Sequence, residues 1–330
     1  MDYMRDSMTT AHWDFGVDKE LKMVDEKLRE MVRSEERTLT DASLHVIDAG
    51  GKRMRPTITI LSYKCLGGED IQRIVDVAAA FELIHSATLI HDDINDGGLA
   101  RRGRETVYKK YGLHSAIVTG DFLFVKAFSL GGMFDKMVVQ TTADACARLA
   151  EGEVLQNRFR HTNEMNVDTY LKVMERKTAE PIRAGAMIGA YLASGPTELV
   201  SELGAYGLNL GIAFQIIDDI LDFTGDERRT GKPTGMDLKE GYLTLPSLLA
   251  MKSSEDVRKA ILDVVRQEDP PPEEVRRCVK LVTDSGAVEK AKGMGEYYAL
   301  EALQHIGSLP DTVHSASLRA MVGKVLNRDS

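Results

Sequence analysis

Three aspartates, Asp92, Asp93 and Asp96, end an apolar stretch of the chain. On a helix, Asp92 and Asp96 lie on one face about one turn apart, and Asp93 lies about 100° round from Asp92. Carboxylate oxygens suit Mg²⁺, which takes one or two protein carboxylates and completes its shell with water and phosphate oxygens. This pattern, the first aspartate motif, indicates a magnesium site, although alone it also fits the solvated end of a helix.

The same spacing recurs at Asp218, Asp219 and Asp222, the second aspartate motif, again after an apolar run. Because two ordinary helix ends seldom share such a pattern, the repeat favours a functional site. Helical bundles build metal sites from carboxylates that point inward from facing helices. We therefore expect the two motifs to hold a cluster of divalent ions with a polyanion between them.

Basic residues stand near both motifs in the sequence, in loops or polar segments. Arginine forks bind phosphate through two parallel hydrogen bonds, and the N-terminus of a helix favours an anion. Each basic cluster alone is typical of a solvated surface. Together they fit a pocket for two diphosphates, one chelated through Mg²⁺ and the other held directly, with help from His85, seven residues before Asp92. The clusters are Lys52, Arg53 and Arg55; Arg101 and Arg102; Lys177 and Thr178; and Lys232.

Helical periodicity runs through the whole chain, and no segment shows the alternation of a β-strand or a βαβ rhythm. The residues before the first motif are apolar nearly all round, which predicts a central helix. The glycine-rich, charged stretch over 225–241 is expected to be a loop. We expect one all-α domain over 1–330, with helices over 17–37, 40–49, 56–66, 70–94, 114–130, 135–160, 167–193, 197–224, 242–252, 254–267, 273–283, 286–306 and 311–326.

The composition is that of an ordinary globular protein, with 43% hydrophobic and 28% charged residues among 330. A formal net charge of −9 argues against a nucleic-acid partner. The three cysteines, Cys65, Cys146 and Cys278, show no pairing pattern, which favours a reducing compartment. The first residues lack the apolar segment of a signal peptide, and no apolar run approaches the length of a membrane span. We expect a cytoplasmic protein without stable membrane insertion.

Five motifs occur in an order and spacing that resemble the trans-polyprenyl diphosphate synthases, with geranylgeranyl and geranylfarnesyl diphosphate synthases as the nearest type. The resemblance runs from about residue 20 to residue 260. It implies the all-α isoprenoid synthase fold, a helical bundle around a central cavity, and a homodimer. The motifs are GGKRMRP at 50–56, DDIND with RRG at 92–103, Lys177-Thr178, FQIIDDILD at 214–222 and GKPTGMDLKEG at 231–241.

The resemblance also implies roles for individual residues. Asp92, Asp96, Asp218 and Asp222 would bind Mg²⁺, with three ions in each active site once substrate is bound. The other residues fall into three sets. The catalytic set is Asp92, Asp93, Asp96, Asp218, Asp219 and Lys177; the allylic diphosphate would contact Arg101, Lys177, Thr178, Gln215 and Lys232; and isopentenyl diphosphate would contact Lys52, Arg55, His85 and Arg102.

The reaction that follows is a head-to-tail prenyl transfer by ionisation, condensation and elimination. Mg²⁺ and cationic side chains stabilise the departing diphosphate, while an apolar cavity excludes the water that would quench an allylic carbocation. One position departs from the family pattern: Tyr242 stands where a lysine usually follows the glycine of DLxEG. A phenol lacks that positive charge, for which Lys239 could substitute.

In the family, product length depends on the residues just before the first motif, and here Ala87 and Thr88 are both small. Further back, Ile84 and Phe81 lie eight and eleven residues before Asp92. On a helix, Phe81 points within about 20° of the Asp92 face, roughly 16 Å along the axis. An open pocket at Ala87 predicts a product longer than fifteen carbons, and twenty to twenty-five carbons is the favoured range.

Two other functions share part of this pattern. A class I terpene cyclase or a squalene-type synthase would have the first motif and the helical fold, but would not need GGKRMRP or the RRG loop. A non-catalytic subunit of a heteromeric synthase would be expected to have lost one aspartate motif, and here both are intact. Incorporation of labelled isopentenyl diphosphate by the pure protein separates the three.

Overall fold

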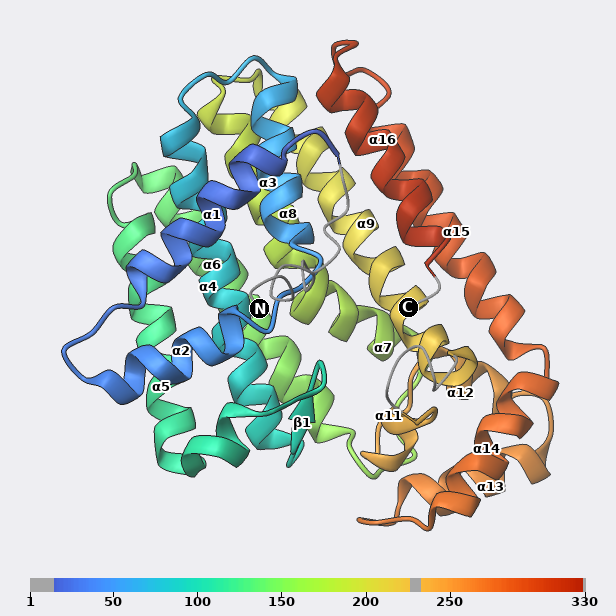
Figure 1. The fold of residues 1–330 in the computed structure, drawn as a ribbon. Helices are drawn as coiled ribbons and strands as arrows, with labels where there is room; N and C mark the ends of the chain where they lie inside the picture. Colours follow the sequence, from blue (N-terminus) through green and yellow to red (C-terminus); the bar gives the residue numbers. More distant parts are fainter. Residues whose placement is uncertain (1–14, 226–232, 329–330) are drawn as a thin grey trace, which may run out of the picture. The chain divides into compact units, whose positions relative to one another are not determined.

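The computed structural model describes residues 15–225 and 233–328, and helices make up most of them (Figure 1). The all-α prediction is confirmed. The elements are α1 (Asp18–Met31), α2 (Arg37–Ile47), α3 (Met54–Cys65), α4 (Ile71–Asn95), β1 (Ala100–Arg101), β2 (Arg104–Glu105), α5 (Val107–Gly131), α6 (Lys136–Arg158), α7 (Val167–Met174), η1 (Glu175–Ala179), α8 (Glu180–Leu192), α9 (Thr197–Thr224), α11 (Met236–Lys239), α12 (Leu245–Ala250), α13 (Glu255–Val265), α14 (Pro272–Asp284), α15 (Ala287–His305) and α16 (Val313–Leu326).

The chain forms two compact units, each assembled from separate segments. The first unit contains Met1–Thr142, Gly185–Val200 and Leu309–Leu318. The second contains Ala143–Ala184, Ser201–Ser308 and Arg319–Ser330. The first aspartate motif belongs to the first unit and the second motif to the second unit. The expectation of one domain over the whole chain stays a prediction.

The first unit is built on α4, which packs against α1, α3 and α5. The side chain of Asp70 begins this helix by accepting a hydrogen bond from the backbone N–H of Arg73, as expected of an N-cap. Burial of Ala78 and Ala80, which lie on opposite sides of the helix, explains why the helix is apolar nearly all round. The helix ends at Asn95, so it delivers the first motif to its C-terminal end.

The core of the second unit forms where apolar side chains of α9 meet those of α7 and of the helices from α12 to α15. From α9 come Ile216 and Phe223, and from α7 comes Tyr170, all fully or almost fully buried. Helix α12 packs against α7, α13, α14 and α15. This core fixes the face of α9 that is opposite to the exposed Asp218.

Several boundaries differ from the sequence-based expectation for local reasons. The helix expected from residue 114 begins at Val107 and is interrupted at Gly112, whose φ of 84° and ψ of 165° are not helical. The expected loop over 225–241 contains the short helix α11. The helix expected over 167–193 contains one π-helical turn, η1. A π-turn has no signal in hydrophobic periodicity, which explains why it was missed.

Helices α4, α5 and α9 are long and apolar enough, by length and composition, to cross a membrane. The expectation that no run approaches this length is therefore wrong. In α4 and α9, 72% and 61% of the most apolar stretch is buried inside the protein, which accounts for their composition. In α5 only 33% is buried, so that helix keeps an apolar face that the described part of the chain does not cover.

Candidate functional site

The first aspartate motif occupies the last turn of α4 and the residue that caps it. The carboxylates of Asp92 and Asp96 are partly exposed there, whereas Asp93 is only 5% exposed. Arg101 Nε donates a hydrogen bond to Asp93 Oδ1 at 2.8 Å. Because the C-terminal end of a helix already carries partial negative charge, carboxylates at this place favour a cation beside them. Asp93 has such a cation in Arg101, while Asp92 and Asp96 are more exposed than Asp93.

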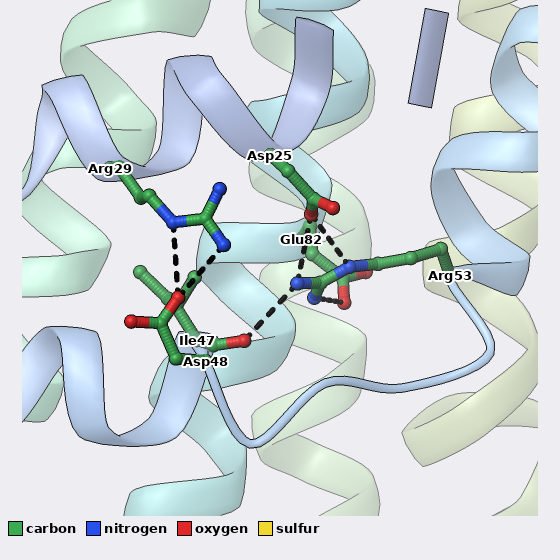
Figure 2. A network of polar contacts seen from close by, with 6 residues as sticks. All are labelled: Asp25, Arg29, Ile47, Asp48, Arg53 and Glu82. Atoms are coloured by element: carbon green, nitrogen blue, oxygen red, sulfur yellow. Dashed lines mark hydrogen bonds and ion pairs between the residues drawn. The ribbon is translucent and has the colours of Figure 1, made fainter. Parts of the chain in front are cut away.

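A buried ion pair anchors the basic loop that contains Lys52 and Arg55 (Figure 2). Arg53, between them, has a left-handed φ of 49° and turns its guanidinium inward, where its side chain is 5% exposed. Its Nη1 donates to Glu82 Oε1 at 2.5 Å, and its Nε and Nη2 contact Asp25 Oδ1 at 3.1 and 3.0 Å. Arg53 is therefore a structural residue of this loop.

The network extends to the end of α2, where Arg53 Nη2 donates to the carbonyl oxygen of Ile47 at 3.2 Å. Next to it, Arg29 and Asp48 form an ion pair at 3.0 Å with both side chains substantially exposed (Figure 2). The buried contacts of Arg53 join α1, α2 and α4 at one point. They fix the backbone on both sides of Arg53. The positions from which the side chains of Lys52 and Arg55 extend are therefore fixed as well.

Arg102 of the RRG loop reaches the same region of the first unit. A Cβ on Gly51 would lie 2.8 Å from Arg102 Nη1, so the absence of a side chain there permits this approach. The charge of Glu82 favours the charged forms of Arg55 and Arg102, whose pKa values burial lowers. Burial, and then the charges of Arg55 and Arg102, lower the pKa of His85 well below its usual value. The structure thus brings Arg55, His85 and Arg102 into one electrostatic cluster around Glu82.

The second aspartate motif lies in the last two turns of α9, and its three carboxylates differ in their partners. Asp219 is 5% exposed and accepts hydrogen bonds from the Tyr170 hydroxyl at 2.6 Å and from Gln215 Nε2 at 2.9 Å. Asp218 is the most open of the three, and Arg328 Nη2 donates to its Oδ1 at 2.8 Å.

Both carboxylate oxygens of Asp222 accept backbone hydrogen bonds at the start of α11. Met236 N donates to Oδ1 at 3.0 Å, and Asp237 N donates to Oδ2 at 3.1 Å. Each oxygen keeps further lone pairs, so the predicted role of Asp222 as a metal ligand stays a prediction. In the structure, Asp222 connects α9 to the GMDLKEG segment.

Two acidic side chains, Asp219 and Asp237, face a small cavity of about 70 Å³ in the second unit. Burial raises the pKa of Asp219 to about 7, against the hydrogen bonds from Tyr170 and Gln215, which lower it. Burial, followed by the charges of Asp222 and Asp219, raises the pKa of Asp237 well above its usual range. Asp219, Asp237, Tyr170, Gln215 and Tyr242 are among the residues that line this cavity.

Lys177 and Thr178 lie on the π-helical turn η1, a conformation that often occurs at functional sites. Thr178 Oγ1 donates to Gln215 Oε1 at 3.1 Å, which connects η1 to the second motif through Asp219. Lys177 Nζ donates to Gln156 Oε1 at 2.9 Å and pairs with Glu153. The structure therefore brings together Thr178, Gln215 and Asp219, and it holds Lys177 against a carboxylate.

Tyr242, the departure from the family pattern, is almost fully buried. The guanidinium of Arg160 lies 5.1 Å from the centre of its ring, and Arg160 Nε donates to the Glu240 carbonyl oxygen at 2.7 Å. Arg160 thus places a positive charge beside Tyr242. Lys239, the substitute that we considered from the sequence, is exposed. Lys232 lies outside the described residues.

The residues expected to set product length are placed in the first unit. Ala87, Ile84 and Phe81 are buried, at 0%, 2% and 2% exposed, and Thr88 is partly buried. Phe81 packs beside α8, where a Cβ on Gly185 would lie 3.8 Å from its ring. Ala87 and Thr88 have small side chains, and from the sequence we expect such side chains to leave room for a longer product.

A divalent cation fits the donor set of these motifs. Among the residues that the structure describes, no three His, Cys, Asp or Glu side chains are grouped closely enough to hold a metal by themselves. Mg²⁺ does not require such a group, because water and substrate phosphate oxygens supply most of its ligands. Asp92 and Asp96 in the first unit are partly exposed and Asp218 in the second unit is exposed, and the carboxylates of each motif are of the kind that would hold such an ion.

A model of the polyprenyl synthetase family matches residues 36–282. The chain belongs to this family. It is therefore a prenyltransferase of the trans-polyprenyl diphosphate synthase type, as the motifs predicted.

Individual relatives agree with this assignment over most of their length. The chain is 36% identical to heptaprenyl diphosphate synthase component 2 of Geobacillus stearothermophilus, over 94% of this chain and 96% of the relative. It is 36% identical to a short chain isoprenyl diphosphate synthase of Methanocaldococcus jannaschii, over 82% and 84%. The crystal structure of a polyprenyl synthase from Caulobacter crescentus, complexed with calcium and isoprenyl diphosphate, is similar with a TM-score of 0.91 at 32% identity, covering 95% and 96% of the two chains.

Several residues of this family member were missed by sequence reasoning. Glu82 carried a usable signal, since an acidic residue inside an otherwise apolar helix needs a buried partner. Tyr170 and Arg328 carried none, because each meets the second motif from a distant part of the chain. Asp237 stood inside a quoted motif but had no role assigned to it.

Proposed function

We propose that this polyprenyl synthetase condenses isopentenyl diphosphate with an allylic diphosphate by Mg²⁺-assisted ionisation, condensation and elimination. The observation that carries the proposal is the pair of aspartate motifs, in which the buried middle residue is satisfied by the protein. The outer residues Asp92 and Asp96 are partly exposed and Asp218 is exposed, so ligands in solution can reach them. Exposed carboxylates of this kind suit a cation that also binds diphosphate.

Bound Mg²⁺ supplies positive charge that stabilises the departing diphosphate. Arg101, Lys177, Thr178 and Gln215 hold the oxygens of the allylic diphosphate, and so does Lys232 by resemblance. The carbon–oxygen bond then breaks and leaves an allylic carbocation, which the double bond of isopentenyl diphosphate attacks. A proton is lost from the new bond's neighbouring carbon to the released diphosphate. Lys52, Arg55, His85 and Arg102 orient the second substrate during these steps.

The product is proposed to be longer than fifteen carbons, in the range of twenty to twenty-five. The small side chains of Ala87 and Thr88 support this range. The named relatives include both a short chain synthase and a heptaprenyl synthase, so their names do not narrow the range of product lengths. Replacement Ala87→Phe should shorten the product, and chromatography of the dephosphorylated alcohols measures the shift. An unchanged profile would show that Ala87 does not limit chain growth.

A homodimer is proposed because α5 exposes an apolar stripe. Its exposed members recur at helical spacing, and Leu113, Val125 and Phe128 are 51%, 64% and 45% exposed. A second copy would cover this face, and sedimentation of the pure protein should give twice the chain mass. A monomer that gains activity only with a second polypeptide would instead agree with the component named in the Geobacillus relative. A cytoplasmic location is part of the same proposal, supported by three cysteines that form no disulfide within the described residues.

The test is incorporation of labelled isopentenyl diphosphate by the pure protein with each allylic primer, with Mg²⁺ or with a chelator. The proposal expects Mg²⁺-dependent, primer-dependent formation of linear prenyl diphosphates. A cyclised or hydrocarbon product formed without isopentenyl diphosphate would indicate a terpene cyclase or squalene-type synthase. No product at all from the pure chain would indicate a non-catalytic subunit.

A further inference from the structure

Arg328 lies two residues after the end of α16. It pairs with Asp218, the most exposed carboxylate of the second aspartate motif. Its Nη2 donates to Asp218 Oδ1 at 2.8 Å, and its guanidinium lies 4.3 Å from the centre of the Phe214 ring. Phe214 and Asp218 are four residues apart on α9, so they lie on one face and a single arginine covers both. The Arg328 side chain is 6% exposed, while that of Asp218 is 47% exposed.

The pairing of Arg328 is incomplete within the described residues. Its Nε and Nη1 are buried and have no hydrogen-bond partner there. Buried donors without partners are unfavourable, because they lose their water and gain nothing in return. One charged hydrogen bond and one ring contact therefore hold the guanidinium at Asp218, against the penalty of two unsatisfied N–H groups. Such a contact can be displaced by a stronger competitor for the carboxylate.

A divalent cation is that competitor. It would take the same carboxylate oxygen, and two cations at one oxygen repel each other. From this we propose that Arg328 is a positioning residue: it orients and neutralises Asp218 while no divalent cation is bound, and it is released when one binds. The inference rests on the proposed function, in which Asp218 is a metal ligand. It adds a residue outside the motifs that sets how tightly the second motif takes its ion.

Two consequences follow from linkage. The apparent dissociation constant for the cation equals the intrinsic constant divided by the fraction of molecules in which Arg328 has left Asp218. Reciprocally, cation binding weakens the contact of Arg328 with α9 by the same factor. A purely structural contact would show neither effect, because it would persist with the cation bound.

The experiment is a titration of the full chain with Mn²⁺, a paramagnetic substitute for Mg²⁺, without any diphosphate. Electron paramagnetic resonance counts the free ion. Arg328→Gln should tighten Mn²⁺ binding by about two- to fivefold, the range expected when a partly exposed ion pair is removed from a ligand. Arg328→Lys should fall between this variant and the wild type. Lys324→Gln, which removes an exposed positive charge from the same end of α16, should leave the affinity unchanged.

Unchanged or weaker Mn²⁺ binding in Arg328→Gln would overturn the inference. Asp218→Asn separates this failure from failure of the proposed metal site. If Asp218→Asn weakens Mn²⁺ binding and Arg328→Gln does not tighten it, only the role of Arg328 is wrong. If Asp218→Asn has no effect, the metal role of Asp218 is wrong as well. Hydrogen exchange gives a second readout, since the peptide with Arg328 should exchange faster when Mn²⁺ is added to the wild type.

Discussion

The first aspartate motif lies among basic side chains, whereas the second lies among acidic ones. In the first unit, Arg101 pairs with Asp93, and burial lowers the pKa values of Arg55 and Arg102 while the charge of Glu82 opposes that lowering. In the second unit, burial and neighbouring carboxylates raise the pKa values of Asp219 and Asp237. One spacing of aspartates has therefore been placed in two opposite electrostatic surroundings.

Comparing the two motifs shows which of their properties follow from the shared spacing and which do not. In both motifs the middle residue, Asp93 or Asp219, is 5% exposed and hydrogen-bonded within the protein. In both, the first residue is more exposed than the middle one. Spacing thus determines which carboxylates can face a ligand, while the surroundings determine how their charge is balanced. The first motif is balanced by arginines, and the second by Arg328 and, as we propose, by cations.

The largest expected effect concerns the open residues. Asp92→Ala and Asp218→Ala should each lower turnover by orders of magnitude, because each removes a carboxylate that would hold Mg²⁺ against the leaving diphosphate. Both side chains are partly exposed, so circular dichroism should show an intact fold. Near-normal turnover in either variant would refute the role of that motif. Asp93→Asn should instead lower thermal stability, since it breaks the buried pair with Arg101.

A second, smaller effect tests the anchor of the basic loop. Glu82→Gln should lower the free energy of unfolding by about 3 kcal/mol, because it leaves Arg53 buried without its main counter-charge. Asp48→Asn is the matched control, since it breaks the exposed pair with Arg29 and should cost less than about 1 kcal/mol. Urea denaturation measures both.

Kinetics of Glu82→Gln distinguish a role of Glu82 in positioning the basic loop from a role as a counter-charge only. If Glu82 positions the loop, Glu82→Gln raises the KM for isopentenyl diphosphate more than the KM for the allylic substrate. If Glu82 were only a counter-charge, its removal would strengthen the positive potential and lower both KM values. Equal stability losses for Glu82→Gln and Asp48→Asn would contradict the structural role of the buried pair.

The smallest expected effect is a pH dependence at His85. The folded-state pKa of His85 lies well below its unfolded value, so the unfolded chain binds more protons below about pH 6.5. Stability should therefore fall as the pH falls through this region. His85→Gln should remove up to about 1 kcal/mol of that loss at pH 5.5, and His114→Gln, at an exposed position of α5, should not. If wild type and His85→Gln lost the same free energy of unfolding between pH 8 and pH 5.5, this would contradict the lowered pKa of His85.

Sequence reasoning located the parts of the molecule that local patterns determine. The bounds of α4 and α9 were close to those observed, because long apolar runs with clear ends set them. Thr178 and Gln215 were expected together and are hydrogen-bonded to each other. The boundaries that failed, at Gly112 and within 225–241, depend on single backbone conformations or on short helices that periodicity does not report.

Contacts between distant segments could not be predicted. Arg53 was one of three cations in a loop, and only the structure shows that it pairs with Asp25 and Glu82 rather than facing solvent. Arg328 meets Asp218 across more than a hundred residues of sequence. Neither pairing has a local signal, since both depend on which helices pack together. The charge balance of the two motifs was therefore invisible until the fold was known.

Whether the two motifs serve one substrate is tested most directly by a double-mutant cycle. Calorimetry would measure the Mg²⁺-dependent affinity for an unreactive allylic thiodiphosphate in wild type, Asp92→Asn, Asp218→Asn and the double variant. If both motifs act on the same diphosphate, the double variant should lose clearly less binding free energy than the two single losses combined. Losses that add to within about 0.5 kcal/mol would show that the motifs act independently, and would contradict the account.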